Sequence, residues 1–217
     1  MSRSSFLAGI IAGGARLLAG PTVRWIGSRP VRRQRVYFAN HTSHLDFVVL
    51  WSVLPPELRR RTRPVAAKDY WQSGLRRQIA VNIFHAVLVE RGTKQSAKAT
   101  GDAQAPHESS RHALDVLLRA LGKRYSLILF PEGTRGSGQG ISIFKSGIYY
   151  LWCKRPDVEF VPVYLSNLNR ILPKGEFLPV PVISHVAFGP PLQLEKNESK
   201  ESFLKKAHAA LEALGRA

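Results

Sequence analysis

Residues 36–54 read VYFANHTSHLDFVVLWSVL, and this stretch joins the pattern of a short strand to the pattern of a buried helix. Val36–Ala39 is short and apolar, and Asn40 after it is typical of a turn, so a strand is expected there. Phe47–Leu54 is a continuous apolar run that two prolines end, which predicts a buried helix. A strand, a polar turn and a helix in this order are typical of an α/β fold.

The same alternation of patterns continues along the chain. A polar stretch rich in small residues, Thr93–Ser109, predicts a loop. Further strands are expected at Val65–Ala67, Ala86–Val89, Ser126–Phe130, Phe160–Leu165 and Val180–Phe188. Further helices are expected at Ser5–Ile26, Trp71–Ile83, Arg111–Leu121, Gly147–Lys154 and Glu201–Leu214. Strands that alternate with helices predict an α/β layer structure.

The first 35 residues differ from the rest of the chain. We expect residues 1–35 to form an N-terminal helical segment and residues 36–217 to form the main domain, which is long enough for a sizeable core. Phe6–Gly20 is apolar but too short to span a bilayer, and Arg16 interrupts it. Thr22–Arg35 combines a tryptophan with many arginines, which is typical of a segment at a membrane surface. The alternative is a first helix that packs on the core.

The charge of the chain limits its partners. With 32 lysines and arginines against 15 aspartates and glutamates, the formal net charge is +17. Such a charge fits nucleic acid, an anionic membrane or acidic small molecules. Zinc-finger spacing, aromatic ribonucleoprotein motifs and a helix-turn-helix signature are all missing from the sequence, so nucleic acid is the weakest of the three. Cys153 is the only cysteine, which excludes an intrachain disulfide and a zinc site built from a cysteine cluster.

The turn after the first strand of the main domain carries candidate catalytic residues. His41 can take a proton from a hydroxyl, and a carboxylate on its other ring nitrogen would fix the tautomer. Asp46 lies five residues later, which on one regular helix would point the two side chains about 140° apart. The pair can therefore meet only if His41 precedes the helix and Asp46 lies in its first turn. Two alternatives stay open: His44 could be the base, and Asp46 could serve only a capping box with Ser43.

A second candidate site follows the apolar strand at Ser126–Phe130. The sequence from Phe130 to Gly136 is FPEGTRG. Gly133 allows the backbone to turn sharply, and Arg135 offers a planar group of donors that matches a phosphate. Glu132 could orient Arg135 or bind a hydroxyl of a substrate. The alternative is a polar turn with an ion pair at the surface.

Together, the two motifs resemble those of the 1-acylglycerol-3-phosphate acyltransferase (PlsC-like) family. The family motif Asn-His-x-Ser-x-x-Asp corresponds to Asn40, His41, Ser43 and Asp46, and its Phe-Pro-Glu-Gly-Thr-Arg motif is intact from Phe130 to Arg135. The resemblance covers about Tyr37 to Pro191 and implies an α/β sheet flanked by helices. It identifies residues 36–217 as an acyltransferase domain.

The resemblance also implies a reaction and assigns roles to the site residues. A fatty acyl chain would pass from acyl-CoA or acyl-carrier protein to the hydroxyl of a lysolipid, with no cofactor and no metal. His41 would be the base, and Asp46 would orient it. The acceptor would be held by Glu132, Gly133, Thr134 and Arg135 of the second motif, with a further phosphate contact from Arg91, which follows the strand expected at Ala86–Val89.

The acceptor and the cellular location follow from the resemblance as expectations. The region between Lys68 and Arg91 departs from the family pattern, so a lyso-aminolipid or a glycolipid is an alternative acceptor to 1-acylglycerol-3-phosphate. The basic charge suits docking on an anionic membrane, at its cytoplasmic face, as a peripheral or monotopic protein. The arginines expected to dock there are Arg24, Arg29, Arg32, Arg33 and Arg35. The alternative hypotheses are a hydrolase, a non-catalytic lipid-binding protein and a nucleic-acid-binding protein.

Overall fold

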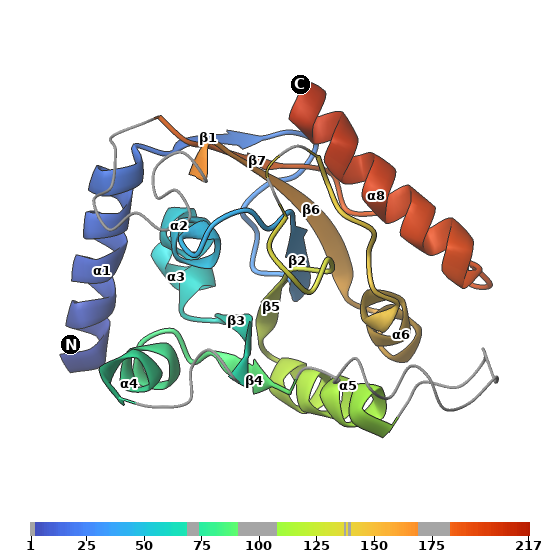
Figure 1. Cartoon of the computed structure of the whole chain (residues 1–217), viewed down its shortest axis with the longest axis horizontal. Coiled ribbons are helices and arrows are strands. Elements are labelled where there is room, and N and C mark those ends of the chain that lie inside the picture. Colours follow the sequence, from blue (N-terminus) through green and yellow to red (C-terminus); the bar gives the residue numbers. More distant parts are fainter. Residues whose placement is uncertain (1–2, 69–73, 91–107, 137, 139, 169–182) are drawn as a thin grey trace.

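The described residues form one seven-stranded sheet with helices on both faces (Figure 1). The computed structural model describes residues 3–68, 74–90, 108–136, 138, 140–168 and 183–217. The strands, in the order in which they lie side by side, are β1 (Thr22–Trp25), β7 (His185–Phe188), β6 (Glu159–Ser166), β2 (Arg35–Ala39), β5 (Ser126–Leu129), β3 (Thr62–Ala67) and β4 (Val87–Val89). Neighbouring strands are parallel except β6 and β7. The predicted α/β sheet flanked by helices is confirmed.

The helices divide into two layers because successive residues of a strand face opposite sides of the sheet. Tyr37 and Ala39 of β2 pack in one core, and Val36 and Phe38 pack in the other. The first core also contains residues of α1 (Arg3–Ala19), α2 (Asp46–Val53), α3 (Pro56–Arg59) and α4 (Gly74–Asn82). The second contains residues of α5 (Glu108–Leu121), α6 (Gly147–Lys154) and α8 (Lys200–Arg216).

Most elements lie where the sequence predicts them, within a few residues at each end. Gly122, with a φ of +47°, ends α5 as expected. The short helix α3 was not predicted. Three predicted features lie outside the described residues: the start of the helix expected at 71, most of the loop expected at 93–109, and the start of the strand expected at 180.

The prediction of a helix from Ser5 to Ile26 is wrong beyond Ala19. Gly20 has a φ of +46° and its N–H donates to the Arg16 carbonyl, so the helix ends there. Pro21 follows, and Thr22–Trp25 is extended and pairs with β7 at the edge of the sheet. The cause is tertiary, because Trp25 stacks on Phe188 with ring centroids 3.9 Å apart. The segment Thr22–Arg35, which was expected at a membrane surface, thus includes strand β1 of the sheet.

Helix α1 packs on the core with one face and exposes apolar side chains on the other. Ala12 and Ala19 are buried, and α1 lies against α2. Its exposed large apolar residues are Phe6, Leu7, Ile10, Leu17 and Leu18. Of the helices within the described residues, none combines the length and the apolar character needed to cross a membrane.

Candidate functional site

The two sequence motifs meet because they follow two adjacent parallel strands. β2 and β5 pair in parallel, with Phe38 opposite Leu129, so both strands end at the same edge of the sheet. Ligand sites of open α/β sheets lie beyond the carboxyl ends of the strands. His41 follows β2 by two residues and Glu132 follows β5 by three, which brings both motifs to this edge.

Asn40 fixes the end of β2 before the chain turns away. Its side chain is buried, and its Nδ2 donates to the Leu165 carbonyl of β6 at 2.8 Å. Its Oδ1 accepts the Leu165 N–H, also at 2.8 Å. The amide thus pairs with β6 as a further strand residue would. From the sequence, Asn40 was predicted only to lie in a turn and to belong to a motif, and its pairing with β6 was not predicted.

His41 and Asp46 are in direct contact. His41 Nδ1 lies 2.8 Å from Asp46 Oδ2. Asp46 is the first residue of α2 and is fully buried, whereas His41 precedes the helix and is 21% exposed. This is the arrangement that the spacing of five residues requires. The same carboxylate oxygen accepts the backbone N–H groups of Thr42 (2.6 Å) and Ser43 (2.8 Å), which hold it in place.

Asp46 therefore both stabilises the turn and contacts His41. Ser43, the N-cap of the capping box considered above, does not cap α2, because Leu45 occupies the cap position and no side chain caps the helix there. The Asp46 carboxylate nevertheless reaches back to the Ser43 N–H, as the acidic residue of a capping box does. Its other oxygen, Oδ1, is buried without a hydrogen-bond partner. The two roles considered for Asp46 are thus compatible.

Phe130 supports the imidazole of His41. The two rings stack with centroids 4.3 Å apart and an angle of 23° between their planes. The contact with Asp46 and the stack on Phe130 together restrict rotation of the ring. Because Nδ1 faces the carboxylate, a proton on Nδ1 can donate to Asp46, and in that tautomer Nε2 carries the lone pair. The only sequence signal for this contact was the place of Phe130 in the motif.

Glu132 joins the two motifs through their backbones. Its side chain is buried, and Oε1 accepts the His41 N–H at 2.8 Å. Oε2 accepts the Ser142 N–H at 3.2 Å, and the Gly136 N–H donates to the His41 carbonyl at 2.8 Å. Both oxygens of Glu132 therefore meet backbone donors, and the backbone of His41 is held by the 132–136 turn on both sides.

Gly133 is required by the conformation of the same turn. Its φ is +72°, where side chains other than glycine are strained. A Cβ on Gly133 would lie 2.6 Å from Cε of Lys145, so the two could not coexist without a shift. Thr134 and Arg135 follow on the exposed side of the turn. The structure thus brings His41, Asp46, Glu132, Gly133, Thr134 and Arg135 together, while Arg91 lies outside the described residues.

Replacing Glu132 with glutamine is expected to lower stability and activity together. A carboxamide offers one oxygen, so its NH2 group would face either the His41 or the Ser142 N–H, and that backbone donor would lose its partner. A buried unpaired donor costs about 1–3 kcal/mol. Chemical denaturation of the variant measures this loss. Wild-type stability would show that Glu132 does not hold the two motifs together.

A salt bridge lies beside this region, at the ends of β3 and β4. Lys68 Nζ lies 2.6 Å from Glu90 Oε1, and both residues directly follow their strands. The hydrogen bond from Lys68 lowers the pKa of Glu90 below its ordinary value. The charge of Lys68 is therefore already partnered. Within the described parts of the chain, no group of three or more His, Cys, Asp or Glu side chains is arranged to hold a metal ion.

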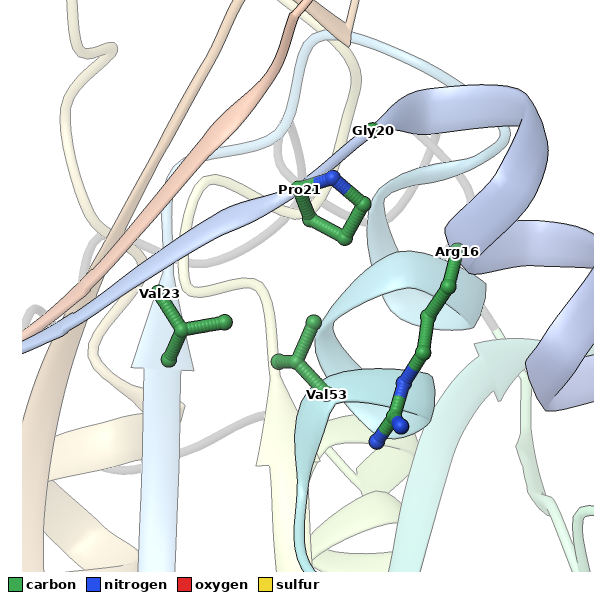
Figure 2. A pocket seen from close by; sticks show the side chains of 5 residues that line it. All are labelled: Arg16, Gly20, Pro21, Val23 and Val53. Atoms are coloured by element: carbon green, nitrogen blue, oxygen red, sulfur yellow. The ribbon is translucent and has the colours of Figure 1, made fainter.

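A cavity of about 420 Å³ lies apart from this site. It is bounded by the end of α1, the turn that follows, β1 and the last turn of α2 (Figure 2). Its lining residues are Arg16, Gly20, Pro21, Val23 and Val53. Arg16 donates to the Ser52 carbonyl at the C-terminal end of α2, whereas Asp46 begins that helix. The cavity is thus at the opposite end of α2 from His41.

Comparison with known proteins connects this geometry to one family. A sequence model of the acyltransferase family matches residues 20–166, which include both motifs. Over 187 residues the chain is 29% identical to a 1-acyl-sn-glycerol-3-phosphate acyltransferase of Limnanthes alba, covering 86% of this chain and 60% of that protein. It is 26% identical to the enzyme of the same name from Escherichia coli K12, covering 63% of this chain and 51% of that protein. The chain thus spans 60% or less of the length of these relatives.

A solved structure shows the same fold. The crystal structure of the 1-acyl-sn-glycerophosphate (LPA) acyltransferase PlsC from Thermotoga maritima superposes with a TM-score of 0.68. The match covers 98% of this chain and 78% of that one, at 18% sequence identity.

Proposed function

The chain belongs to the acyltransferase family, and from this premise we propose that it acylates the free hydroxyl of a lysolipid. The donor is a fatty acyl thioester of coenzyme A or acyl-carrier protein, and the acceptor is 1-acylglycerol-3-phosphate or a related lysolipid. The observation that supports this most is the His41–Asp46 pair, held against the turn that carries Arg135. A base beside an anion-binding turn suits an acceptor with both a hydroxyl and a phosphate.

In the proposed reaction, His41 acts through Nε2. The Nε2 lone pair takes the proton of the acceptor hydroxyl as its oxygen attacks the thioester carbonyl carbon. The C–S bond then breaks, and the leaving thiolate takes up the proton that Nε2 received from the acceptor hydroxyl. Asp46 keeps the other proton on Nδ1 and stabilises the imidazolium formed between the two steps. No nucleophile of the protein is needed, because the acceptor hydroxyl attacks directly.

The turn from Glu132 to Arg135 would hold the acceptor. Arg135 would bind the phosphate with its guanidinium, and Thr134 and the backbone of Gly133 would contact the phosphate or glycerol. We propose that Glu132 acts by positioning His41 and the turn, since both of its oxygens accept backbone N–H groups. The phosphate contact of Arg91, which the family resemblance implies, stays a prediction.

We also propose that the protein docks on an anionic membrane at its cytoplasmic face, and the exposed apolar face of α1 supports the docking itself. Several of the arginines expected to dock there have protein partners. Arg35 is buried and pairs with Glu159, and Arg33 pairs with the same carboxylate. Arg32 pairs with Glu57, although both side chains are exposed. We therefore assign the docking to the apolar face of α1 and exclude Arg35 from it.

A thiol-release assay tests the proposed function. Coenzyme A and carrier-protein thioesters are each offered with a panel of lysophosphatidic acid, other lysophospholipids, a lyso-aminolipid and a glycolipid, and the lipid products are analysed. We expect thiol release that depends on the acceptor, with an acylated lipid as product. Free fatty acid as the only product would identify a hydrolase. Salt-sensitive nucleic-acid binding without thioester turnover would favour a different class of protein.

Replacing Arg135 with alanine is expected mainly to weaken acceptor binding. The substitution removes a charge-assisted contact with the phosphate, so KM for the acceptor should rise about tenfold or more. Arg135 is exposed, so the fold should persist. Initial rates at varied acceptor concentration measure the effect. An unchanged KM for the acceptor would show that Arg135 does not bind it.

A further inference from the structure

Lys145 lies over the turn that carries Arg135, although it comes ten residues later in the chain. The Cδ, Cε and Nζ atoms of Lys145 would be 2.9, 2.6 and 2.7 Å from a Cβ placed on Gly133. The whole outer half of the lysine side chain therefore crosses the turn at its glycine. The absence of a side chain at Gly133 is what leaves room for it.

The backbone holds Lys145 in this place. Its N–H donates to the Pro131 carbonyl at 2.8 Å. Just before it, Ser142 is tied to Glu132, and Phe144 is buried in the core that contains α6 and α8. The backbone of Lys145 is thus anchored by its own N–H and by the residues just before it, while its side chain remains exposed.

The ammonium of Lys145 makes no ion pair or hydrogen bond with any residue that the structure describes. Two other lysines are paired with glutamates. Lys68 pairs with Glu90, and Lys206 pairs with Glu198. A cation that is held in place without a protein anion is available to a ligand anion.

Arg135 and Lys145 are close enough to serve one anion. Arg135 is two residues from Gly133, so their Cα atoms are at most about 7 Å apart. Arg135 belongs to the turn whose Gly136 N–H donates to the His41 carbonyl, and Lys145 Nζ lies over the same turn, beside Gly133. A phosphate monoester carries about −1.5 to −2 charges at neutral pH. A phosphodiester carries about −1, for which a single cation suffices.

We propose that Lys145 is a second cation of the acceptor site and that it holds the acceptor phosphate together with Arg135. This inference rests on the proposed function and adds a phosphate-binding residue to its acceptor site. The ammonium contacts the phosphate of the acceptor and takes no part in proton transfer.

The substitution that tests the inference is Lys145→Met. Methionine keeps an unbranched side chain over Gly133 but removes the charge. The variant therefore tests the loss of the charge with little change in packing. Lys154→Ala, at the exposed end of α6, is a matched control for the loss of one positive charge. Initial rates are measured for the wild type and both variants with lysophosphatidic acid, lysophosphatidylcholine and the acyl thioester varied in turn.

For Lys145→Met we expect KM for lysophosphatidic acid to rise about tenfold, which corresponds to ~1.4 kcal/mol. KM for the thioester and for lysophosphatidylcholine should stay within about twofold, and the Lys154→Ala control should match the wild type. Two results would each overturn the inference alone: an unchanged Lys145→Met variant, or a rise confined to the thioester KM. A wild type that acylates no lysolipid would instead overturn the proposed function itself.

Discussion

Replacing His41 with alanine is expected to lower the rate of acyl transfer by between about 100-fold and 10,000-fold, the usual contribution of a positioned general base. His41 supplies the only imidazole that the structure places against a buried carboxylate within the described residues. Without Nε2, the acceptor hydroxyl must attack without losing its proton to the protein. Thiol release at saturating concentrations of both substrates measures the loss.

The fold of the His41→Ala variant should remain intact, which makes the test specific. The His41 side chain is 21% exposed and contacts Asp46 and Phe130. Its backbone bonds to Glu132 and Gly136 do not depend on the side chain. Thermal unfolding would confirm this. His44→Ala is the matched control, because His44 was the other candidate base in the sequence. Near-normal turnover in the His41 variant, or an equal loss in the His44 variant, would contradict the mechanism.

The order of elements could be predicted because it depends on local patterns. Apolar runs such as Val36–Ala39 and Ser126–Phe130 are short and end in turn residues, and both became adjacent central strands. The end of α1 could not be predicted in the same way. Thr22–Trp25 is extended because it pairs with β7, a strand more than 150 residues later, and a local pattern contains no information about that partner.

The contact between His41 and Asp46 could be predicted from the sequence, but the contacts of Glu132 could not. His41 and Asp46 were constrained to meet by their spacing and by the start of the helix. The sequence suggested that Glu132 orients Arg135 or binds a hydroxyl of the substrate. The structure shows instead that its two oxygens accept the N–H groups of His41 and Ser142. Lys145 carried no signal at all, because its place over Gly133 depends on how the 136–145 segment folds back on the turn.

Replacing Asp46 with asparagine is expected to reduce transfer nearly as much as loss of His41, by about 1,000-fold. The asparagine side chain has the same shape, and its oxygen can accept the N–H groups of Thr42 and Ser43 as Oδ2 does. It carries no charge, so it cannot stabilise the imidazolium, and neutralising the partner of a catalytic histidine in this way costs up to about 10,000-fold in hydrolases with a Ser-His-Asp triad. Alanine would be a poorer choice, because two buried N–H groups would each lose a partner at about 1–3 kcal/mol.

A double variant separates the catalytic role of Asp46 from its role in the turn. If Asp46 acts through His41, the His41→Ala/Asp46→Asn protein should be no slower than His41→Ala alone, because residues that act as a unit have non-additive effects. If Asp46 only stabilises the turn, the Asp46→Asn variant, which keeps the contacts with Thr42 and Ser43, should retain nearly wild-type activity and stability. Asp115→Asn, on the exposed side of α5, controls for the loss of one carboxylate. Rates and unfolding curves of the wild type, the two single variants, the double variant and the Asp115→Asn control therefore decide whether the contact between Asp46 Oδ2 and His41 Nδ1 serves catalysis.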